Sequence, residues 1–468
     1  MLQPQGDLFR EKCGVFGIYA PEEDVGYLTY TGLFALQHRG QESAGIAITD
    51  GRTIVLEKDR GLVAEVFTPQ RLDRLHGHLA IGHVLYGNTD TKSNVENAEP
   101  LAVTSRQGSL ALAYNGQITN AASLRAELRR QGYLFRTDSD IEVIASLIAQ
   151  AEDPDLQAAV ISTLKRLTGA YALVVLTPDR IMGIRDPHGI RPLSLGRFDD
   201  GYVLASETCA FDTIGAQFVR PVEPGELVSI GLNGISSHRF AQGKKAVCTF
   251  EYIYFARPDS LIEGVGVHGA RRRAGRILAT EHPAQADMVI SVPDSGTSAA
   301  LGYAEAAGIP LDAGLIKNRY VGRTFIKPGQ KDREFAVQLK LSPLREVLAG
   351  KSVVMVDDSI VRGTTCGRLV RVLKQAGVKS VHVRIASPPV VSPCYYGIDT
   401  PNLDELVAAR LEGEDIRKKI GADSLAFLSI DGLKQAVGLP GEPYCLACFS
   451  GHYPAGRMHG EGKDKEHE

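Results

Sequence analysis

The stretch VVMVDDSIVRGTT, from Val353 to Thr365, decides the fold expected for the second half of the chain. Its leading apolar residues are typical of a buried strand, and its Ser, Gly and Thr residues are typical of a loop that holds an anion. Asp357 and Asp358 stand between the strand and the loop. A loop suited to a negative group that opens with two carboxylates must serve two chemically different parts of one ligand.

The segments around this stretch repeat a strand–helix–strand pattern. From about residue 287, apolar segments such as MVISVPD and SVHVRIASPP alternate with segments of helical spacing such as CGRLVRVLKQAG. This alternation predicts an α/β domain with a parallel, doubly wound sheet. Because ligands bind at the carboxyl ends of the strands in such sheets, we expect a binding site directly after VVMV.

The residues after the strand indicate which ligand this site takes. The helix that follows offers N-terminal amides and a dipole that favour a phosphate, and Gly363 lets the backbone approach it closely. The carboxylates need another target, which can be vicinal ribose hydroxyls, positive charge developing at C1, or Mg²⁺ on a pyrophosphate. The pattern therefore predicts a site for a phosphorylated ribose. An ordinary turn after a strand is the alternative, although unpartnered buried acids are costly.

The stretch resembles the phosphoribosylpyrophosphate-binding motif of the type I phosphoribosyltransferases. The resemblance implies that phosphoribosylpyrophosphate is bound by Asp357, Asp358, Ser359, Arg362, Gly363, Thr364 and Thr365. It also implies that Mg²⁺ is held by Asp357, Asp358 and Ser295, the last in the pyrophosphate-loop-like segment SVPDSGTSAA at 291–300. The basic segment 314–341 is similar to the loop that closes over the substrate in this family, and a solvated charged loop is the alternative. Its candidates for nucleotide contacts are Lys317, Arg319 and Arg323.

The first half of the chain has a different texture. Short β-like segments such as CGVFGIYA and YALVVLT are separated by Gly, Asn and Asp, and the helical patterns SLRAELRRQGY and EVIASLIAQAED interrupt them. This mixture predicts packed antiparallel sheets with helices outside. We expect a first domain over 13–235, a hinge within 231–246, a second domain over 236–455 and a disordered tail over 456–468.

Cys13 lies before an apolar strand, where a lone cysteine is more typical of a core residue. Three segments accompany it: LQHRGQESAGIA at 36–47, YNGQITN at 114–120 and TDSDIE at 137–142. Together they resemble the glutaminase domain of class II amidotransferases, an α+β fold with αββα layers in the N-terminal nucleophile hydrolase family. The resemblance implies that residues 1–12 are a propeptide and that the site consists of Cys13 as nucleophile, Asn115 and Gly116 as oxyanion hole, and Arg39 and Asp140 as glutamine-binding residues.

Removal of residues 1–12 gives such a nucleophile its base. A peptide nitrogen is not basic, whereas a free α-amine has a pKa of about 7.7–8.0 and is partly unprotonated near neutral pH. The amine of Cys13 can then take the proton from its own thiol. We expect an uncleaved chain to be inactive as a glutaminase.

Leu85 departs from the amidotransferase pattern. In GHVLYGNTD, at 82–90, it stands where the family has an arginine that clamps the glutamine carboxylate. Loss of a charge-assisted hydrogen bond costs about 1.5–3 kcal/mol, or roughly ten- to a hundredfold in binding. We expect weakened use of glutamine, with ammonia supporting turnover relatively well.

The cysteines suggest a metal site. Cys445 and Cys448 form a C-x-x-C, which by spacing alone is half of a zinc site or a redox pair. Cys248 and Cys394 complete a set of four, and their contexts resemble the iron–sulfur branch of the glutamine phosphoribosylpyrophosphate amidotransferases. Four thiolates suit zinc or a cluster chemically, and the resemblance implies a structural [4Fe-4S] cluster. Cys209 and Cys366 are expected in the core.

With both halves matched, nearly the whole chain resembles the amidophosphoribosyltransferases. The resemblance implies that glutamine is hydrolysed at Cys13 and that ammonia passes to phosphoribosylpyrophosphate, giving 5-phosphoribosylamine in the step that opens purine nucleotide synthesis. It also implies a homotetramer that purine nucleotides inhibit. Two rivals are a regulatory paralogue that binds phosphoribosylpyrophosphate but has a weak or lost glutaminase, and a class II amidotransferase with a different synthase partner.

Composition narrows the remaining function classes. The 468 residues are 44% hydrophobic and 23% charged, as in an ordinary globular protein of several domains. The net charge of −3 leaves no basic surplus for nucleic acid, and no apolar run is long enough for a membrane span. Because the opening MLQPQGDLFREK lacks the apolar core of a signal peptide, we expect a cytoplasmic protein.

Overall fold

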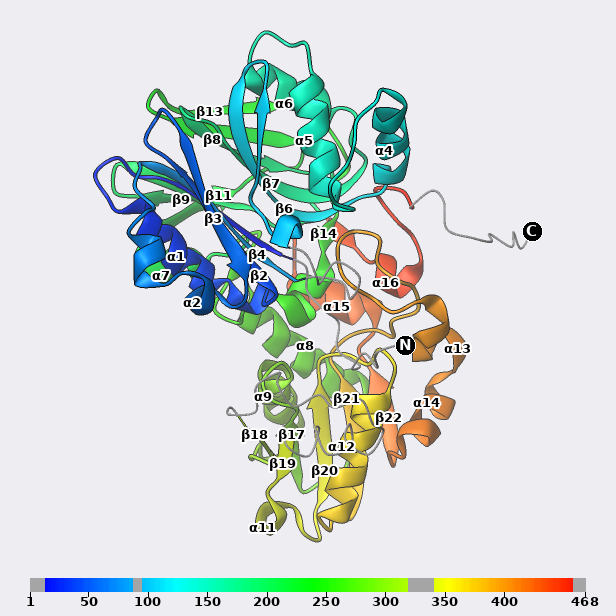
Figure 1. Cartoon of the computed structure of the whole chain (residues 1–468). Coiled ribbons are helices and arrows are strands. Elements are labelled where there is room, and N and C mark those ends of the chain that lie inside the picture. The colour runs from blue at the N-terminus through cyan, green and yellow to red at the C-terminus, as the bar shows by residue number, and fades with distance from the viewer. Residues whose placement is uncertain (1–12, 87–94, 319–340, 458–468) are drawn as a thin grey trace, which may run out of the picture.

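The computed structural model describes residues 13–86, 95–318 and 341–457. The predicted propeptide, Arg319, Arg323 and all but two residues of the predicted tail lie outside these ranges. Figure 1 shows two bodies joined end to end, with the first half of the chain in blue to green and the second in green to red.

The first half contains two antiparallel sheets packed face to face. The seven-stranded sheet has the order β11-β9-β10-β1-β4-β2-β3, and the six-stranded sheet has the order β13-β12-β8-β7-β6-β5. In chain order the strands are β1 (Gly14–Tyr19), β2 (Ser43–Thr49), β3 (Ile54–Arg60), β4 (Leu79–Leu85), β5 (Leu101–Ser105), β6 (Gly108–Ile118), β7 (Gly169–Leu176), β8 (Arg180–Arg185), β9 (Ser194–Phe198), β10 (Gly201–Ala205), β11 (Gln217–Pro221), β12 (Glu226–Gly231) and β13 (Gly234–Arg239).

Helices cover the outer face of each sheet, so the predicted αββα layers are confirmed. α1 (Val25–Ala35) and α7 (Cys209–Ile214) pack on the seven-stranded sheet through a core that includes Phe16 and Phe211. α4 (Ala121–Arg130), α5 (Asp140–Gln150) and α6 (Leu156–Leu164) cover the other sheet. A separate core fills the space between the sheets, because alternate residues of strands such as β7 face opposite layers.

The second half is built on a parallel sheet, as the β-α-β pattern predicts. Its order is β17-β20-β21-β22, and all three pairings are parallel. The strands are β17 (Met288–Ser291), β20 (Ser352–Asp357), β21 (Ser380–Ile385) and β22 (Ser424–Phe427). Helices α8 (Val267–Glu281), α9 (Thr297–Ala307) and α15 (Ile430–Val437) pack on one face, and α12 (Thr364–Gln375) and α14 (Gly413–Ile420) on the other.

The apolar run that opens VVMVDD follows from this double covering. Val353 and Met355 belong to the core under α12, whereas Val354 and Val356 belong to the core under α8 and α9. Because both faces of β20 are buried, the strand reads as continuous rather than alternating apolar sequence.

The predicted hinge at 231–246 is wrong in its first part. Residues 234–239 form β13, which pairs with β12 along its whole length. The six-stranded sheet of the first half therefore extends past residue 235 to Arg239. β13 is an exposed edge strand and therefore lacks the apolar alternation by which a strand is recognised in sequence. The passage to the second half lies between Arg239 and β14 (Val247–Cys248).

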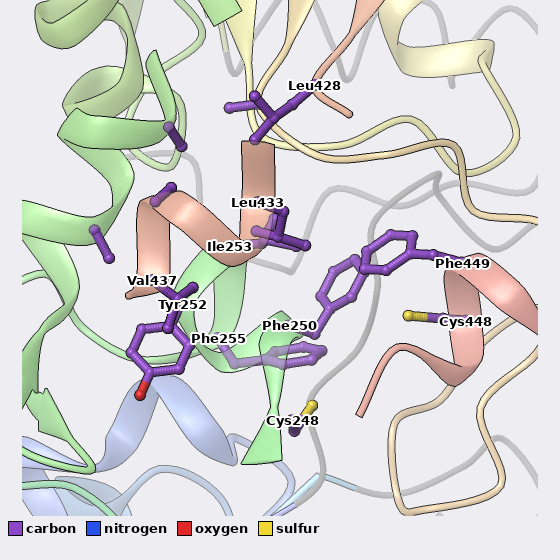
Figure 2. Close-up of a cluster of buried hydrophobic side chains, with 14 of the residues drawn as sticks. Cys248, Phe250, Tyr252, Ile253, Phe255, Leu428, Leu433, Val437, Cys448 and Phe449 are labelled. Carbon is purple, nitrogen blue, oxygen red and sulfur yellow. The ribbon is translucent and has the colours of Figure 1, made fainter. Parts of the chain in front are cut away.

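Short elements connect residues 444–450 of the C-terminal segment to the chain between the two halves. β14 pairs in parallel with β23 (Tyr444–Cys445), and α16 (Ala447–Ser450) follows. The π-helical turn η3 (Glu251–Phe255) comes directly after β14. Phe250 stacks on Phe449 with a centroid distance of 5.7 Å, and Figure 2 shows these rings beside Cys248 and Cys448. None of the described helices is both long and apolar enough to cross a membrane.

Candidate active sites

Cys13 lies next to the seven-stranded sheet of the first half. It is 6% exposed, has a φ of 68° and directly precedes β1. β1 pairs with β4 so that Gly14 faces Val84, and Leu85, the next residue of β4, pairs with Ser43 of β2. The position that departs from the family pattern is therefore one residue along β4 from the partner of Gly14, the residue that follows the predicted nucleophile.

The predicted oxyanion residues lie on β6, in the six-stranded sheet that packs against the sheet of β1. Asn115 is fully buried, and its Oδ1 accepts a hydrogen bond of 3.1 Å from Nη2 of Arg191. Its Nδ2 has no hydrogen-bond partner among the described residues, so a donor remains for a developing oxyanion. Gly116 has a φ of 149°, and a Cβ there would lie 2.1 Å from the carbonyl oxygen of Ala170. No other residue type fits that position.

Electrostatics place Asp140 in the same neighbourhood. Burial raises the pKa of Tyr114 well above its usual range, and the charges of Asp140, Glu99 and Cys13 add to the shift. Asp140 begins α5, and its Oδ2 accepts a hydrogen bond of 3.2 Å from the amide of Ile118 at the end of β6. The structure therefore brings Cys13, Asn115, Gly116 and Asp140 together at one end of β6.

Two buried side chains fix the backbone just before Asn115. Glu99 Oε2 accepts from the Tyr114 amide at 2.8 Å, and Nε2 of His83 lies 2.9 Å from the Tyr114 carbonyl oxygen. The same two side chains approach each other to 3.3 Å. Burial raises the pKa of Glu99 to about 8 and lowers the pKa of His83 to about 3, so both are neutral at pH 7. The sequence gives no signal for this pair.

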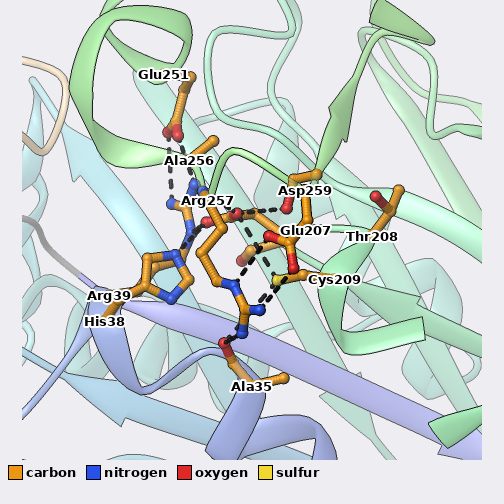
Figure 3. Close-up of polar contacts among 12 residues, drawn as sticks. Ala35, His38, Arg39, Glu207, Thr208, Cys209, Glu251, Ala256, Arg257 and Asp259 are labelled. Atoms are coloured by element: carbon orange, nitrogen blue, oxygen red, sulfur yellow. Dashed lines mark hydrogen bonds and ion pairs between the residues drawn. The ribbon is translucent and has the colours of Figure 1, made fainter. Parts of the chain in front are cut away.

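Arg39 lies in a buried ion-pair network. Its guanidinium is 1% exposed and contacts two buried carboxylates, those of Glu207 and Glu251 (Figure 3). Although burial opposes ionisation, Arg39 and His38 hold the pKa of Glu207 well below its usual range. Arg39 thus ties the first half to η3 of the second half, and its role in holding glutamine stays a prediction.

The residues that complete this buried network were not predicted. Glu207 also accepts from the Arg257 amide at 2.8 Å and from the Ser260 hydroxyl at 2.7 Å. Arg191 lies 3.7 Å from Glu251. These side chains come from segments far apart in sequence, and Figure 3 shows Glu207, Glu251 and Arg257 converging on one region between the halves.

The paired acids lie at the carboxyl end of β20, where the sequence places them. Asp357 is the last residue of the strand, and its Oδ1 accepts from the Asp358 amide at 2.9 Å. Burial raises the pKa of both carboxyls, and the charge of Asp358 raises that of Asp357 further. Ser295, Ser359 and Arg271 act in the opposite direction on Asp358. Ionisation of both acids therefore calls for a cation or hydroxyl donors from a ligand.

The loop after the acids leads into a helix N-terminus. Gly363 has a φ of 77°, and Thr364 and Thr365 form the first turn of α12. Arg362 forms an ion pair of 3.1 Å with Glu405. These backbone and hydroxyl groups lie at a helix N-terminus, which suits a phosphate, and their role as a phosphate cradle stays a prediction.

The second predicted loop packs directly against the acids. A Cβ on Gly296 would lie 2.6 Å from the Val356 carbonyl oxygen and 3.2 Å from Cα of Asp357. Ser295 and Asp358 line one small cavity together with Arg271. Lys317, at the end of β18 (Leu315–Lys317), forms an ion pair of 2.6 Å with Asp294 of this loop. The basic side chain predicted to contact nucleotides is therefore within reach of the pyrophosphate loop.

The four cysteines of the predicted metal site also converge. The β14–β23 pairing sets Cys248 opposite Cys445, and the amides of residues 391 and 392 donate to the carbonyl oxygen of Cys448. Burial raises the pKa of Cys248 to about 12 and the pKa values of Cys445 and Cys448 well above their usual range, and the charges of neighbouring thiols, Cys394 among them, add to the shifts of Cys445 and Cys448. Among the described residues, however, no three cysteine, histidine or acidic side chains are gathered closely enough for one metal ion. Cys209 and Cys366 lie in cores, as predicted.

Comparison with known proteins agrees with both halves. A family model described as a glutamine amidotransferase domain matches residues 89–213, and one described as a phosphoribosyl transferase domain matches residues 266–387. An amidophosphoribosyltransferase of Bacillus subtilis is 51% identical over 450 residues, covering 95% of this chain and 94% of that protein. The chain belongs to the amidophosphoribosyltransferase family.

Solved structures of the amidophosphoribosyltransferase family share the whole fold. One is glutamine phosphoribosylpyrophosphate amidotransferase from B. subtilis complexed with ADP and GMP, with a TM-score of 0.90, 50% identity and coverage of 95% of this chain and 98% of that one. Another, described as the allosteric regulatory enzyme of purine biosynthesis, has a TM-score of 0.92 at 50% identity and covers 96% and 97%. The predicted pairing of a glutaminase fold with a phosphoribosyltransferase fold is thereby confirmed.

Proposed function

We propose that this chain transfers the amide nitrogen of glutamine to C1 of phosphoribosylpyrophosphate, which gives 5-phosphoribosylamine, pyrophosphate and glutamate. This is the amidophosphoribosyltransferase reaction, the first committed step of purine nucleotide synthesis. The observation that carries the proposal is the presence of two complementary sites in one family member: Cys13 beside Asn115 in the first half, and the paired acids at the end of β20 in the second.

The first half supplies ammonia. Once residues 1–12 are removed, the Cys13 amine takes the thiol proton, and the sulfur attacks the carboxamide carbon of glutamine. Asn115 Nδ2 and the Gly116 amide donate to the oxyanion. The tetrahedral intermediate collapses to a thioester as ammonia leaves with a proton returned by the amine, and water then releases glutamate. Asp140, the first residue of α5, accepts from the glutamine ammonium group in this proposal.

The second half holds the acceptor. The cradle of Ser359, Gly363, Thr364 and Thr365 binds the 5-phosphate, and Asp357 and Asp358 face the ribose. Ammonia attacks C1 while the bond from C1 to the pyrophosphate oxygen breaks on the opposite face, so the configuration at C1 inverts. The carboxylates stabilise the positive charge that develops on the ring.

Two absent groups fit residues that are present. The acid pair is buried, and Asp358 lines a small cavity with Ser295, so these side chains offer hard oxygen ligands that suit Mg²⁺; when bound, Mg²⁺ would neutralise the departing pyrophosphate. The cysteine set Cys248, Cys394, Cys445 and Cys448 would hold a [4Fe-4S] cluster, as in the iron–sulfur branch that their contexts resemble. Four thiolates also suit zinc chemically, and metal analysis of the purified protein distinguishes the two.

The regulatory and cellular setting follows the family. We infer that purine nucleotides inhibit the enzyme through a site that includes Lys317, supported by the Lys317 contact with the pyrophosphate loop and by the ADP and GMP named for the B. subtilis relative. A homotetramer and a cytoplasmic location are proposed on the same ground. Nucleic acid and membrane have no place in this function.

A glutaminase weakened by Leu85 is the second candidate function. Leu85 follows Val84, the partner of Gly14, and offers no charge for the glutamine carboxylate. On this alternative the chain is a phosphoribosylpyrophosphate-binding paralogue that is ammonia-dependent or regulatory.

One assay separates the candidates. Pyrophosphate release from phosphoribosylpyrophosphate is followed with glutamine, with ammonia and with neither. The main proposal expects release with either nitrogen source, the ammonia-dependent alternative expects release with ammonia only, and a regulatory protein releases none. The mass of the amino terminus, taken on the same sample, shows whether Cys13 has been exposed.

A further inference from the structure

The residues of the predicted oxyanion hole are held in place from outside their own half of the chain. We propose that Glu251 and Gly397, both in the second half, are positioning residues for Asn115 and Gly116, so that glutamine hydrolysis requires the second half to be docked. This inference rests on the function proposed above.

The first of these positioning contacts acts on Asn115 through the guanidinium of Arg191. Nη2 of Arg191 donates to Oδ1 of Asn115 at 3.1 Å and lies 3.7 Å from Oε1 of Glu251. Nε and Nη1 of Arg191 have no hydrogen-bond partner among the described residues. Because Arg191 is 2% exposed and Glu251 is fully buried, their attraction is little screened by solvent. Glu251 therefore holds the guanidinium of Arg191 in position, and this guanidinium orients the side-chain amide of Asn115.

The orientation of the Asn115 side chain decides its chemistry. While Arg191 donates to Oδ1, the amide nitrogen faces away with its hydrogens available to an oxyanion. If the guanidinium shifts, the amide can rotate and present its oxygen instead, which repels the negative charge. An effect on the chemical step is expected rather than an effect on glutamine binding.

The second of these positioning contacts is steric and acts on the backbone of Gly116. Gly397 has a φ of 99°, and a Cβ there would lie 2.8 Å from both Cα and the carbonyl carbon of Gly116. On its other side Gly116 meets β7, where its own Cβ would lie 2.1 Å from the Ala170 carbonyl oxygen. The Gly116 amide is therefore confined between β7 of the first half and residue 397 of the second, and neither neighbour is a side chain that can move aside.

The experiment compares nitrogen sources in matched variants of the full chain. Gly397→Ala adds one methyl group against Gly116, and Glu251→Gln removes the charge that holds Arg191. Gly441→Ala is the control, because Gly441 has a similar left-handed φ of 74° but no atom within 4 Å of an added Cβ. For each variant kcat and KM are measured with glutamine and with ammonia, and the amino-terminal mass confirms that Cys13 is exposed.

We expect Gly397→Ala and Glu251→Gln each to lower the glutamine kcat by about ten- to a hundredfold, below the full loss of an oxyanion donor. The ammonia-dependent rate of both variants should stay within about twofold of wild type, because the second site is untouched, and Gly397→Ala should also keep the wild-type glutamine KM. Glu251→Gln also removes an ion-pair partner of Arg39, a predicted glutamine-binding residue, so this variant is compared by kcat alone. Gly441→Ala should resemble wild type with both nitrogen sources.

Conservative substitution gives a separate test if one variant does not fold. Arg191→Met should lose glutamine kcat as Glu251→Gln does, and Arg191→Lys should recover part of it by keeping a donor near Asn115. The inference is overturned if glutamine and ammonia turnover fall in parallel, or if both Gly397→Ala and Glu251→Gln keep the wild-type glutamine kcat. If the wild type makes no product even from ammonia, it is the proposed function that fails.

Discussion

Leu85 is the residue from which we expect a changed balance between two nitrogen sources. It is partly buried at the end of β4, next to the residue that pairs with Gly14, and stands where the family pattern has an arginine. We expect Leu85→Arg to lower the glutamine KM by roughly ten- to a hundredfold, since it restores a charge-assisted hydrogen bond. Steady-state kinetics with glutamine and with ammonia measure this effect. Leu134→Arg, at a position that is 88% exposed in the same half, is the control. An unchanged glutamine KM contradicts the prediction.

Cys13 separates the two half-reactions at the same scale. Cys13→Ala removes the nucleophile, so glutamine-dependent turnover should fall by more than about a thousandfold. Ammonia-dependent turnover should survive, because the acids at Asp357 and Asp358 are unaltered. Pyrophosphate release with each nitrogen source is the measurement. A loss of both activities would mean that Cys13 supports the fold rather than the chemistry.

Single residues also mark what the sequence could and could not reveal. Cys13, Asn115 and Asp357 stand in local motifs whose order along the chain carries their chemistry. The structure puts Asp357 at the end of β20 as expected, Cys13 directly before β1 and Asn115 within β6. Glu207 and Glu251 have no such local pattern. They meet Arg39 across separations of 168 and 212 positions, so only the folded chain brings them together.

At the scale of elements, β6 is held by a hydrogen bond from its Tyr114 amide to Glu99, a side chain whose charge depends on pH. Burial raises the pKa of Glu99 from 4.5 to about 8. Between these two pH values the folded state therefore keeps a proton on Glu99 that the unfolded state has lost. Stability contributed by Glu99 is therefore present below about pH 4.5 and is lost as the pH rises towards 8, by on the order of 4 kcal/mol. Glu99→Gln keeps the acceptor for the Tyr114 amide but cannot ionise.

We expect the stability difference between Glu99→Gln and wild type to shift in favour of the variant between pH 5 and pH 8.5. Urea unfolding at several pH values measures it, and taking the difference cancels the contribution of groups that do not contact Glu99. Parallel pH profiles for the two proteins would show that Glu99 is already ionised in the folded state.

Elements differ in how readily sequence predicts them. β20 and α12 were predicted because a strand buried on both faces and an amphipathic helix leave strong periodic signals. β13 was missed because every one of its residues is exposed, and the glycines on either side of its hairpin resemble those of a linker.

At the scale of the whole molecule, four thiols join segments that are otherwise distant. Cys394→Ala should remove a ligand of the proposed cluster, so the purified protein should lose iron and visible absorbance and unfold at a lower temperature. Cys366→Ala, in a core remote from that set, should keep the iron. Iron and zinc analysis with thermal melts provides the check. A wild-type protein that contains zinc in place of iron would contradict the cluster assignment.

The pairing of β14 with β23 bears on the order in which the molecule is made. The Thr249 hydroxyl donates to the Cys445 carbonyl across 196 positions, and the Val247 amide donates to the Pro443 carbonyl. On the ribosome the glutaminase sheets are complete once Arg239 has emerged, whereas residues 247–249 must wait for almost the last segment to be translated. A nascent chain can therefore finish one lobe early, and the other closes only at the end of synthesis.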